Sequence, residues 1–176
     1  GKNAILKGMN LQKEGTTILW NENNALPIGK KNVSLFGLGA FAYAYSGHGS
    51  GTAEGGSLTM YEALKQAGIN VNETLWNAMK TDYYKYEDVT NGKIVVKNSS
   101  EIPWDKMNTS QVQSSYANYN DTAIYVITRR SGEVGWGNDL LTKNAGTIDG
   151  DYFSLFEREK TVLKELTNLR KNGTFK

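Results

Sequence analysis

Residues 122–128, with the sequence TAIYVIT, constrain the fold most, because they form a nearly unbroken run of apolar and β-branched side chains. Such a run is typical of a strand that is buried on both faces, as in a parallel sheet covered by helices on each side. We therefore expect this strand to lie at the centre of a parallel sheet.

A β-α-β unit is predicted upstream of that strand. Two short apolar runs, at 33–36 and 69–71, predict strands, and residues 59–67 between them have the pattern of a helix. A right-handed crossover of this kind joins parallel strands of one sheet. The predicted fold class is therefore α/β, a three-layer α/β/α sandwich with a mostly parallel sheet.

Two helices carry the same predicted N-terminal signal, a Ser or Thr followed three residues later by Glu. Thr59 and Glu62 have this capping-box spacing in the helix of the β-α-β unit. Ser154 and Glu157 have it at the start of a long amphipathic helix over 154–169. An α/β pattern would ordinarily continue with another strand after this helix, so we expect the sheet to be incomplete.

The remaining segments give shorter predictions. Residues 3–14 have the pattern of a helix that ends at Gly15, and residues 73–86 have the pattern of a second helix. Residues 16–20 are predicted to form a strand. Residues 72–118 are rich in Asn, Ser, Lys and Tyr and are expected to form an insertion at the sheet's edge. The chain as a whole, 1–176, is expected to form a single domain.

Composition excludes several function classes. The chain has 20 Lys and Arg against 18 Asp and Glu, without a long block of either sign, so no nucleic-acid partner is expected. It has no Cys and one His, which excludes disulfides and a multi-His metal site, and no cofactor is expected. No apolar run approaches the ~18 residues of a membrane span. We expect a soluble protein, bacterial cytoplasmic or secreted, with no membrane partner.

Two glycine-rich segments invite a nucleotide interpretation. Residues 37–42 (GLGAFA) match the GxGxxA fingerprint, but Asn72 stands where a dinucleotide site needs an acidic residue for the ribose. Residues 46–51 (SGHGSG) lack the Lys-Ser/Thr of a phosphate-binding loop. In that loop His48 is either an ordinary exposed side chain or a contact with a ligand.

Glu133 is the candidate for acid–base chemistry, because it follows the strongest strand at the sheet edge where α/β proteins carry functional loops. Burial would raise the pKa of its carboxyl and allow it to act as a general acid. The alternative is a solvated Glu133 paired with Arg129 or Arg130. Trp136 either belongs to the core or offers a flat apolar face to a sugar ring.

Several segments together resemble the second domain of glycoside hydrolase family 3. Residues 14–28 (EGTTILWNENNALPI) are the most specific of them. The others follow in the family's order: 33–37 (VSLFG), 47–51 (GHGSG), the helix over 58–68, the strand and loop over 121–133 (DTAIYVITRRSGE), and the helix over 151–166. The resemblance covers most of the chain outside 72–118.

The resemblance implies part of a retaining, exo-acting β-glycosidase of the β-glucosidase or β-xylosidase type. The nucleophilic Asp of this family lies in a preceding barrel domain, so the implied partners are that barrel and a β-linked oligosaccharide or glycoside. Glu133 would then be the acid/base, although Val134 replaces the family's glycine and Asp139 is an alternative acid.

The implied substrate contacts are His48, Ser50, Arg130 and Trp136. This chain alone is predicted to be inactive, and a homo-oligomer is among the expected assemblies. Two other functions stay open at this point: a non-catalytic carbohydrate-binding or scaffolding domain, and a nucleotide-binding α/β domain.

Overall fold

The computed structural model describes residues 2–23, 25–29, 31–42, 58–81, 83–86, 89–90, 93–94, 101–129 and 154–176. Within them lies an open parallel sheet of three strands, in the order β2-β1-β5. The strands are β1 (Asn32–Phe36), β2 (Asn70–Val71) and β5 (Thr122–Tyr125).

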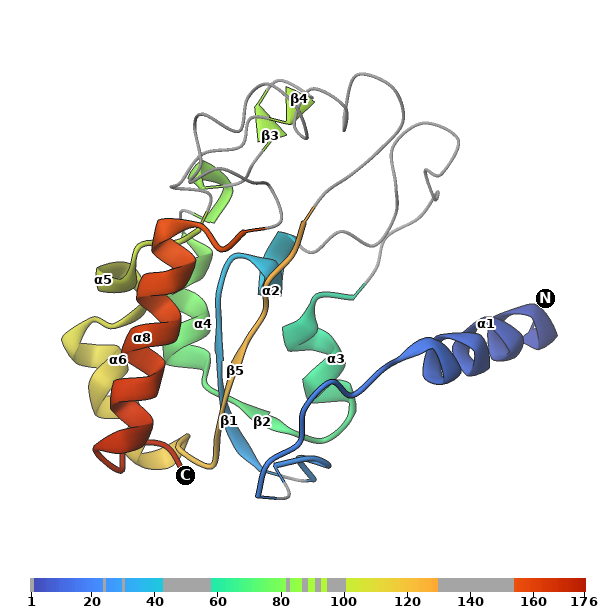
Figure 1. Ribbon diagram of the computed structural model, residues 1–176, viewed down its shortest axis with the longest axis horizontal. Coiled ribbons are helices and arrows are strands. Elements are labelled where there is room, and N and C mark those ends of the chain that lie inside the picture. The colour runs from blue at the N-terminus through green and yellow to red at the C-terminus, as the bar shows by residue number, and fades with distance from the viewer. Residues whose placement is uncertain are drawn as a thin grey trace.

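Helices cover the sheet on two sides (Figure 1). On one side lies α3 (Met60–Gln66), and on the other lie α4 (Glu73–Lys80), α6 (Ser110–Ser115) and α8 (Glu157–Lys171). The predicted α/β class with layered helices and a parallel sheet is confirmed. The remaining elements are α1 (Lys2–Gly15), α2 (Gly39–Ala42), η2 (Tyr83–Lys85), β3 (Val89–Thr90), β4 (Lys93–Ile94), α5 (Trp104–Met107) and η3 (Tyr116–Asn118). None of the helices found in the described ranges is long and apolar enough to cross a membrane.

The central strand is β1, and the expectation that residues 122–128 would be central is wrong for the described sheet. Val33, Leu35 and Phe36 of β1 are fully or almost fully buried, because this strand has a neighbour on each side and helices over both faces. β5 pairs only with β1 among the described strands, and all four of its residues are half-buried. Apolar composition therefore identified the strand correctly but not its place in the sheet.

The β-α-β unit is confirmed, and so is the capping box that starts its helix. Thr59 Oγ1 accepts the Glu62 N–H at 3.2 Å, and a Glu62 carboxylate oxygen accepts the Thr59 N–H at 2.7 Å. Gly68 ends the helix in the left-handed region, at φ +77°, where glycine carries no steric penalty.

The capping box predicted from Ser154 and Glu157 is wrong. Helix α8 begins at Glu157 with Phe156 as its N-cap, and the Phe156 N–H is accepted by the Glu159 carboxylate at 2.8 Å. Glu157 instead pairs with Lys160 at 2.7 Å on the exposed surface. Glu159, at the third position of the helix, is thus buried, and Glu157, at the first position, faces solvent.

The part of 72–118 that the structure describes supplies a layer of the core. The helix predicted over 73–86 is observed as α4, which ends at Lys80, followed by the single turn η2. Met107, Val112 and Tyr116, from α5 to η3, are buried, and the Tyr116 and Phe36 ring centroids are 6.2 Å apart. Whether this region is an insertion, and whether 1–176 is one domain, stay predictions.

The N-terminal segment differs in part from expectation. The helix predicted over 3–14 is confirmed as α1, which extends away from the sheet and has no buried residue (Figure 1). The strand predicted over 16–20 is wrong, because no described strand lies alongside these residues to accept its hydrogen bonds. Leu19 and Trp20 are 90% and 79% exposed.

Candidate functional site

The order of the strands creates a switch point between β1 and β5. From β1 the chain runs outward to β2 and then returns to pair as β5 on the opposite side of β1. The carboxyl ends of β1 and β5 lie side by side, with Phe36 opposite Tyr125 and the Val126 N–H donating to the Phe36 carbonyl at 3.2 Å. In open α/β sheets, ligands bind in the crevice at such a point.

The turn after β1 is pressed directly against the end of β5. A Cβ added to Gly37, which has φ +98°, would come within 2.6 Å of the Tyr125 ring. A Cβ added to Gly39 would overlap the carbonyl oxygen of Val126. The glycines of the GxGxxA match are therefore explained by close packing between two strand ends.

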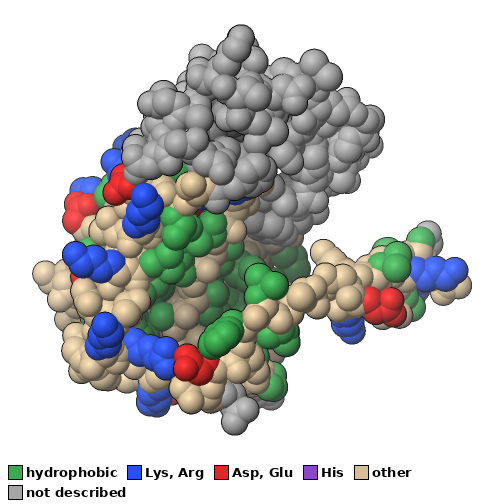
Figure 2. Space-filling view, in the orientation of Figure 1, with side chains coloured by type: hydrophobic (Ala, Val, Ile, Leu, Met, Phe, Trp, Pro, Cys, Tyr) green, Lys and Arg blue, Asp and Glu red, His purple; other side chains and the backbone are tan. Residues whose placement is uncertain are grey.

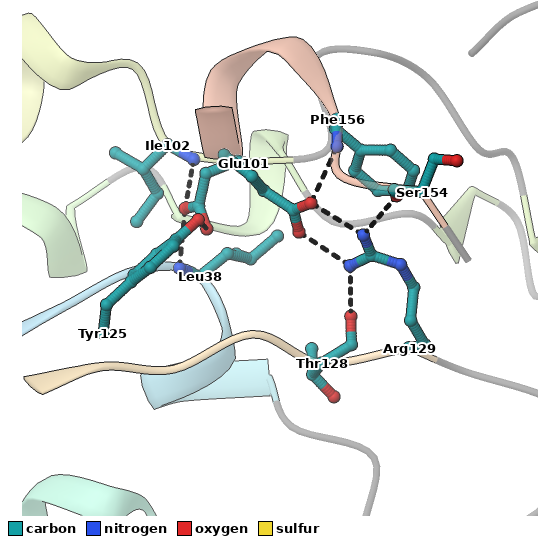
Figure 3. Close-up of polar contacts among 9 residues, drawn as sticks. Leu38, Glu101, Ile102, Tyr125, Thr128, Arg129, Ser154 and Phe156 are labelled. Atoms are coloured by element: carbon teal, nitrogen blue, oxygen red, sulfur yellow. Dashed lines mark hydrogen bonds and ion pairs between the residues drawn. The ribbon is translucent and has the colours of Figure 1, made fainter. Parts of the chain in front are cut away.

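A buried carboxylate, Glu101, ties that turn to β5 (Figure 3). It accepts the backbone N–H of Leu38 at 2.7 Å, the N–H of Ile102 at 2.6 Å and the Tyr125 hydroxyl at 2.9 Å. Glu101 is 2% exposed, and this burial raises its pKa to about 7 against the opposing effect of the three donors.

This contact argues against a nucleotide site. A dinucleotide phosphate binds backbone N–H groups where the first helix begins, but the Leu38 N–H there is already taken by Glu101. Helix α2, which follows, is only four residues long. Among the described residues there is also no group of three metal-binding side chains.

A second buried carboxylate, Glu159, holds Arg129 just beyond β5. The Arg129 Nη1 and Nη2 atoms lie 2.6 and 2.7 Å from the two Glu159 carboxylate oxygens, the paired geometry that suits a guanidinium. Nη1 also donates to the Thr128 carbonyl and Nη2 to the Ser154 carbonyl, each at 2.9 Å. Glu133 and Arg130 lie outside the described residues, so the alternative of Glu133 paired with Arg129 or Arg130 stays a prediction.

The predicted site residues themselves lie outside the described residues: His48, Ser50, Arg130, Glu133, Trp136 and the alternative acid Asp139. Their segments nevertheless begin at known places. Residues 43–57 follow α2 and the β1 turn, and 130–153 follow Arg129 and β5. Both segments follow strands that end at the switch point, since Ala42 lies six residues after Phe36 and Arg129 four residues after Tyr125.

Sequence reasoning missed Glu101 and Glu159. Glu159 carried a usable signal, because an acidic residue in the first turn of a helix commonly accepts the N-cap N–H. Glu101 carried none, since its partners Leu38 and Tyr125 lie 63 and 24 residues away along the chain.

Comparison with known proteins decides the family. Residues 16–175 match the model of the glycosyl hydrolase family 3 C-terminal domain. The chain belongs to glycoside hydrolase family 3. Its resemblance to that family, first seen in short segments, thus extends over nearly the whole chain.

Two family relatives illustrate the match. Beta-glucosidase A from Butyrivibrio fibrisolvens is 30% identical over an alignment 172 residues long, and the match covers 86% of this chain and 19% of that protein. Beta-glucosidase 3B from Thermotoga neapolitana, solved in complex with alpha-D-glucose, matches with a TM-score of 0.64 and 26% identity, over 90% of this chain and 21% of that one. This family 3 chain therefore spans about a fifth of the length of these relatives.

Proposed function

We propose that this chain is the part of a retaining, exo-acting β-glycosidase, of the β-glucosidase or β-xylosidase type, that carries the general acid/base. Glu133 is the proposed acid/base, and a barrel domain of the same enzyme supplies the nucleophile. The observation that carries the proposal is the switch point: the segment with Glu133 and the segment with His48 follow two strands whose carboxyl ends are adjacent, at Tyr125 and Phe36.

The chemistry requires two carboxyl groups in one site. In retaining glycosidases they lie roughly 5–5.5 Å apart, one attacking the anomeric carbon and the other protonating the leaving oxygen. This chain is proposed to supply only the second. His48, Ser50, Arg130 and Trp136 are the proposed contacts with a β-linked glycoside, Trp136 through the apolar face of a sugar ring.

The chain alone is expected to show no glycosidase activity, because the covalent route is lost without the nucleophile. Purified chain and full-length enzyme should be assayed side by side on aryl β-glucosides and β-xylosides, with turnover above buffer expected only from the full-length enzyme. Dose-dependent hydrolysis by the chain would refute the divided site. A full-length enzyme inactive on every glycoside would instead favour the carbohydrate-binding alternative.

The isolated chain is also expected to self-associate. A groove of about 680 Å³ runs beside β5 and α8, and the apolar side chains in its lining include Trp20, Tyr125, Leu163, Leu166 and Phe175. Figure 2 shows hydrophobic side chains gathered in this hollow. Among the described strands, the outer edge of β5 has no neighbour. An open strand edge beside exposed apolar surface promotes pairing with another chain.

Light scattering on the isolated chain should therefore report a dimer at high concentration. Replacing Leu163, which is 37% exposed at the groove, by Lys should shift the equilibrium toward monomer. A compact monomer for the unmodified chain across the whole concentration range would contradict the expectation.

A further inference from the structure

We propose that Arg129, held in place by Glu159, is a positioning residue that joins the two ends of segment 130–153 and so sets the reach of Glu133. The inference rests on the proposed function of Glu133, but the contacts that carry it lie entirely among described residues. Arg129 is the last described residue before the segment, and Ser154 is the first one after it.

The two ends of the segment are joined through one guanidinium group. Arg129 Nη2 donates to the Ser154 carbonyl at 2.9 Å, and Nη1 donates to the carbonyl of the preceding Thr128, also at 2.9 Å (Figure 3). One side chain therefore fixes where the chain enters the segment and where it leaves.

The guanidinium is itself fixed on three sides. Glu159 binds both Nη atoms, so that together with the two carbonyls each of the four Nη hydrogens has an acceptor. The Phe156 ring lies below the guanidinium, with the Arg129 Cζ 4.1 Å from its centroid. Glu159 is buried, with 3% of its side chain exposed, and Arg129 is partly buried, with 18% exposed.

Glu159 is oriented by the helix that carries it. Its carboxylate accepts the Phe156 N–H at 2.8 Å, which is the N-cap N–H of α8. Arg129 is thus held by a residue of a helix and not by a residue of a loop. A lysine at 129 could not reproduce this arrangement, because an ammonium group lacks the planar fork that binds two carboxylate oxygens at once.

The position of Arg129 limits where Glu133 can be. A chain extends at most about 3.3–3.6 Å per residue, so fixing the Cα of Arg129 limits the reach of a residue four positions further along the chain to about 14 Å. A general acid must come within hydrogen-bond distance of the leaving oxygen, and a displacement of about 1 Å can cost ~10²-fold in rate. Loosening Arg129 should therefore impair proton donation, and thermal unfolding of each variant measures the separate effect on folding.

The test uses the full-length enzyme and the variant Arg129→Lys, with Arg170→Lys as the matched control. Arg170→Lys is the same chemical change, and Arg170 lies in the last turn of α8, at the opposite end of the helix from Glu159. Values of kcat/KM are measured on an aryl glycoside with a poor leaving group and on an activated dinitrophenyl glycoside. Thermal unfolding is followed for every variant.

We expect Arg129→Lys to lose on the order of 10²-fold on the poor leaving group and less than about tenfold on the activated one, because only the former needs full protonation. Arg170→Lys should stay within about twofold of the wild type on both. In Arg129→Ala, added guanidinium chloride at non-denaturing concentration should restore part of the activity on the poor leaving group.

Two outcomes would overturn the inference: equal losses on both glycosides without guanidinium rescue, or wild-type rates for Arg129→Lys. Glu133→Gln measured in parallel separates this failure from failure of the proposed function. If Glu133→Gln shows the leaving-group dependence and Arg129→Lys does not, Glu133 remains the acid and Arg129 has no positioning role. If neither shows it, the proposed acid is wrong as well.

Discussion

Glu133→Gln in the full-length enzyme is expected to lower kcat/KM on glycosides with poor leaving groups by about 10²- to 10⁴-fold, the contribution typical of a general acid. An activated aryl glycoside should lose far less, because its leaving group is stable as an anion and needs little protonation. The variant is nearly isosteric, so the difference between the two substrates reports proton transfer and not a change in shape.

Asp139→Asn is the matched control for this variant, since Asp139 is the other carboxylate of the segment considered as the acid. Leaving-group dependence in Asp139→Asn, with near-wild-type rates in Glu133→Gln, would move the acid role to Asp139. Near-wild-type rates in both variants would agree with a solvated Glu133 paired with Arg130.

Glu101→Ala is expected to lower the free energy of unfolding by about 3 kcal/mol or more. It leaves two buried N–H groups, of Leu38 and Ile102, and the Tyr125 hydroxyl without their acceptor, at roughly 1–3 kcal/mol each. Glu101→Gln should cost less than about 1.5 kcal/mol, because its carbonyl oxygen still accepts both N–H groups and its amide can donate to the hydroxyl. Urea unfolding of the chain, followed by tryptophan fluorescence, measures both values.

Glu101 also predicts a pH dependence of stability. Its pKa is about 7 in the folded chain, raised by burial, against about 4.3 when unfolded, so between these values the folded state binds the extra proton. The free energy of unfolding should therefore fall, by up to about 3 kcal/mol, as the pH rises from ~4.3 to ~7. Glu101→Gln should remove most of this slope, and an unchanged slope in that variant would assign it to other groups.

Local sequence patterns were enough to predict most elements of the fold. The apolar runs that form β1 and β2, and the capping box at Thr59, depend on neighbours only a few residues away. The wrong predictions concern segments whose structure depends on which strands lie beside them. Residues 16–20 have the side chains of a strand but no strand beside them, and β5 has the composition of a central strand while pairing on one side in the described sheet.

The site could be predicted only in part, for a related reason. The strand that precedes Glu133 was evident from the sequence, and the family resemblance gave the candidate residues. The polar contacts that organise the strand ends were not evident, because Glu101 contacts Leu38 across 63 residues and Glu159 contacts Arg129 across 30. Such long-range contacts leave no periodic signal in a single sequence.

The role of Glu133 is tested most directly by the product that the Glu133→Gln enzyme forms with azide. In the second step of a retaining mechanism the acid/base carboxylate activates water, and azide needs no such base. Azide should therefore accelerate turnover of an activated aryl β-glycoside by Glu133→Gln and yield the glycosyl azide of retained, β configuration, identified by NMR. Unchanged turnover with no glycosyl azide would contradict the assignment of Glu133 as the acid/base.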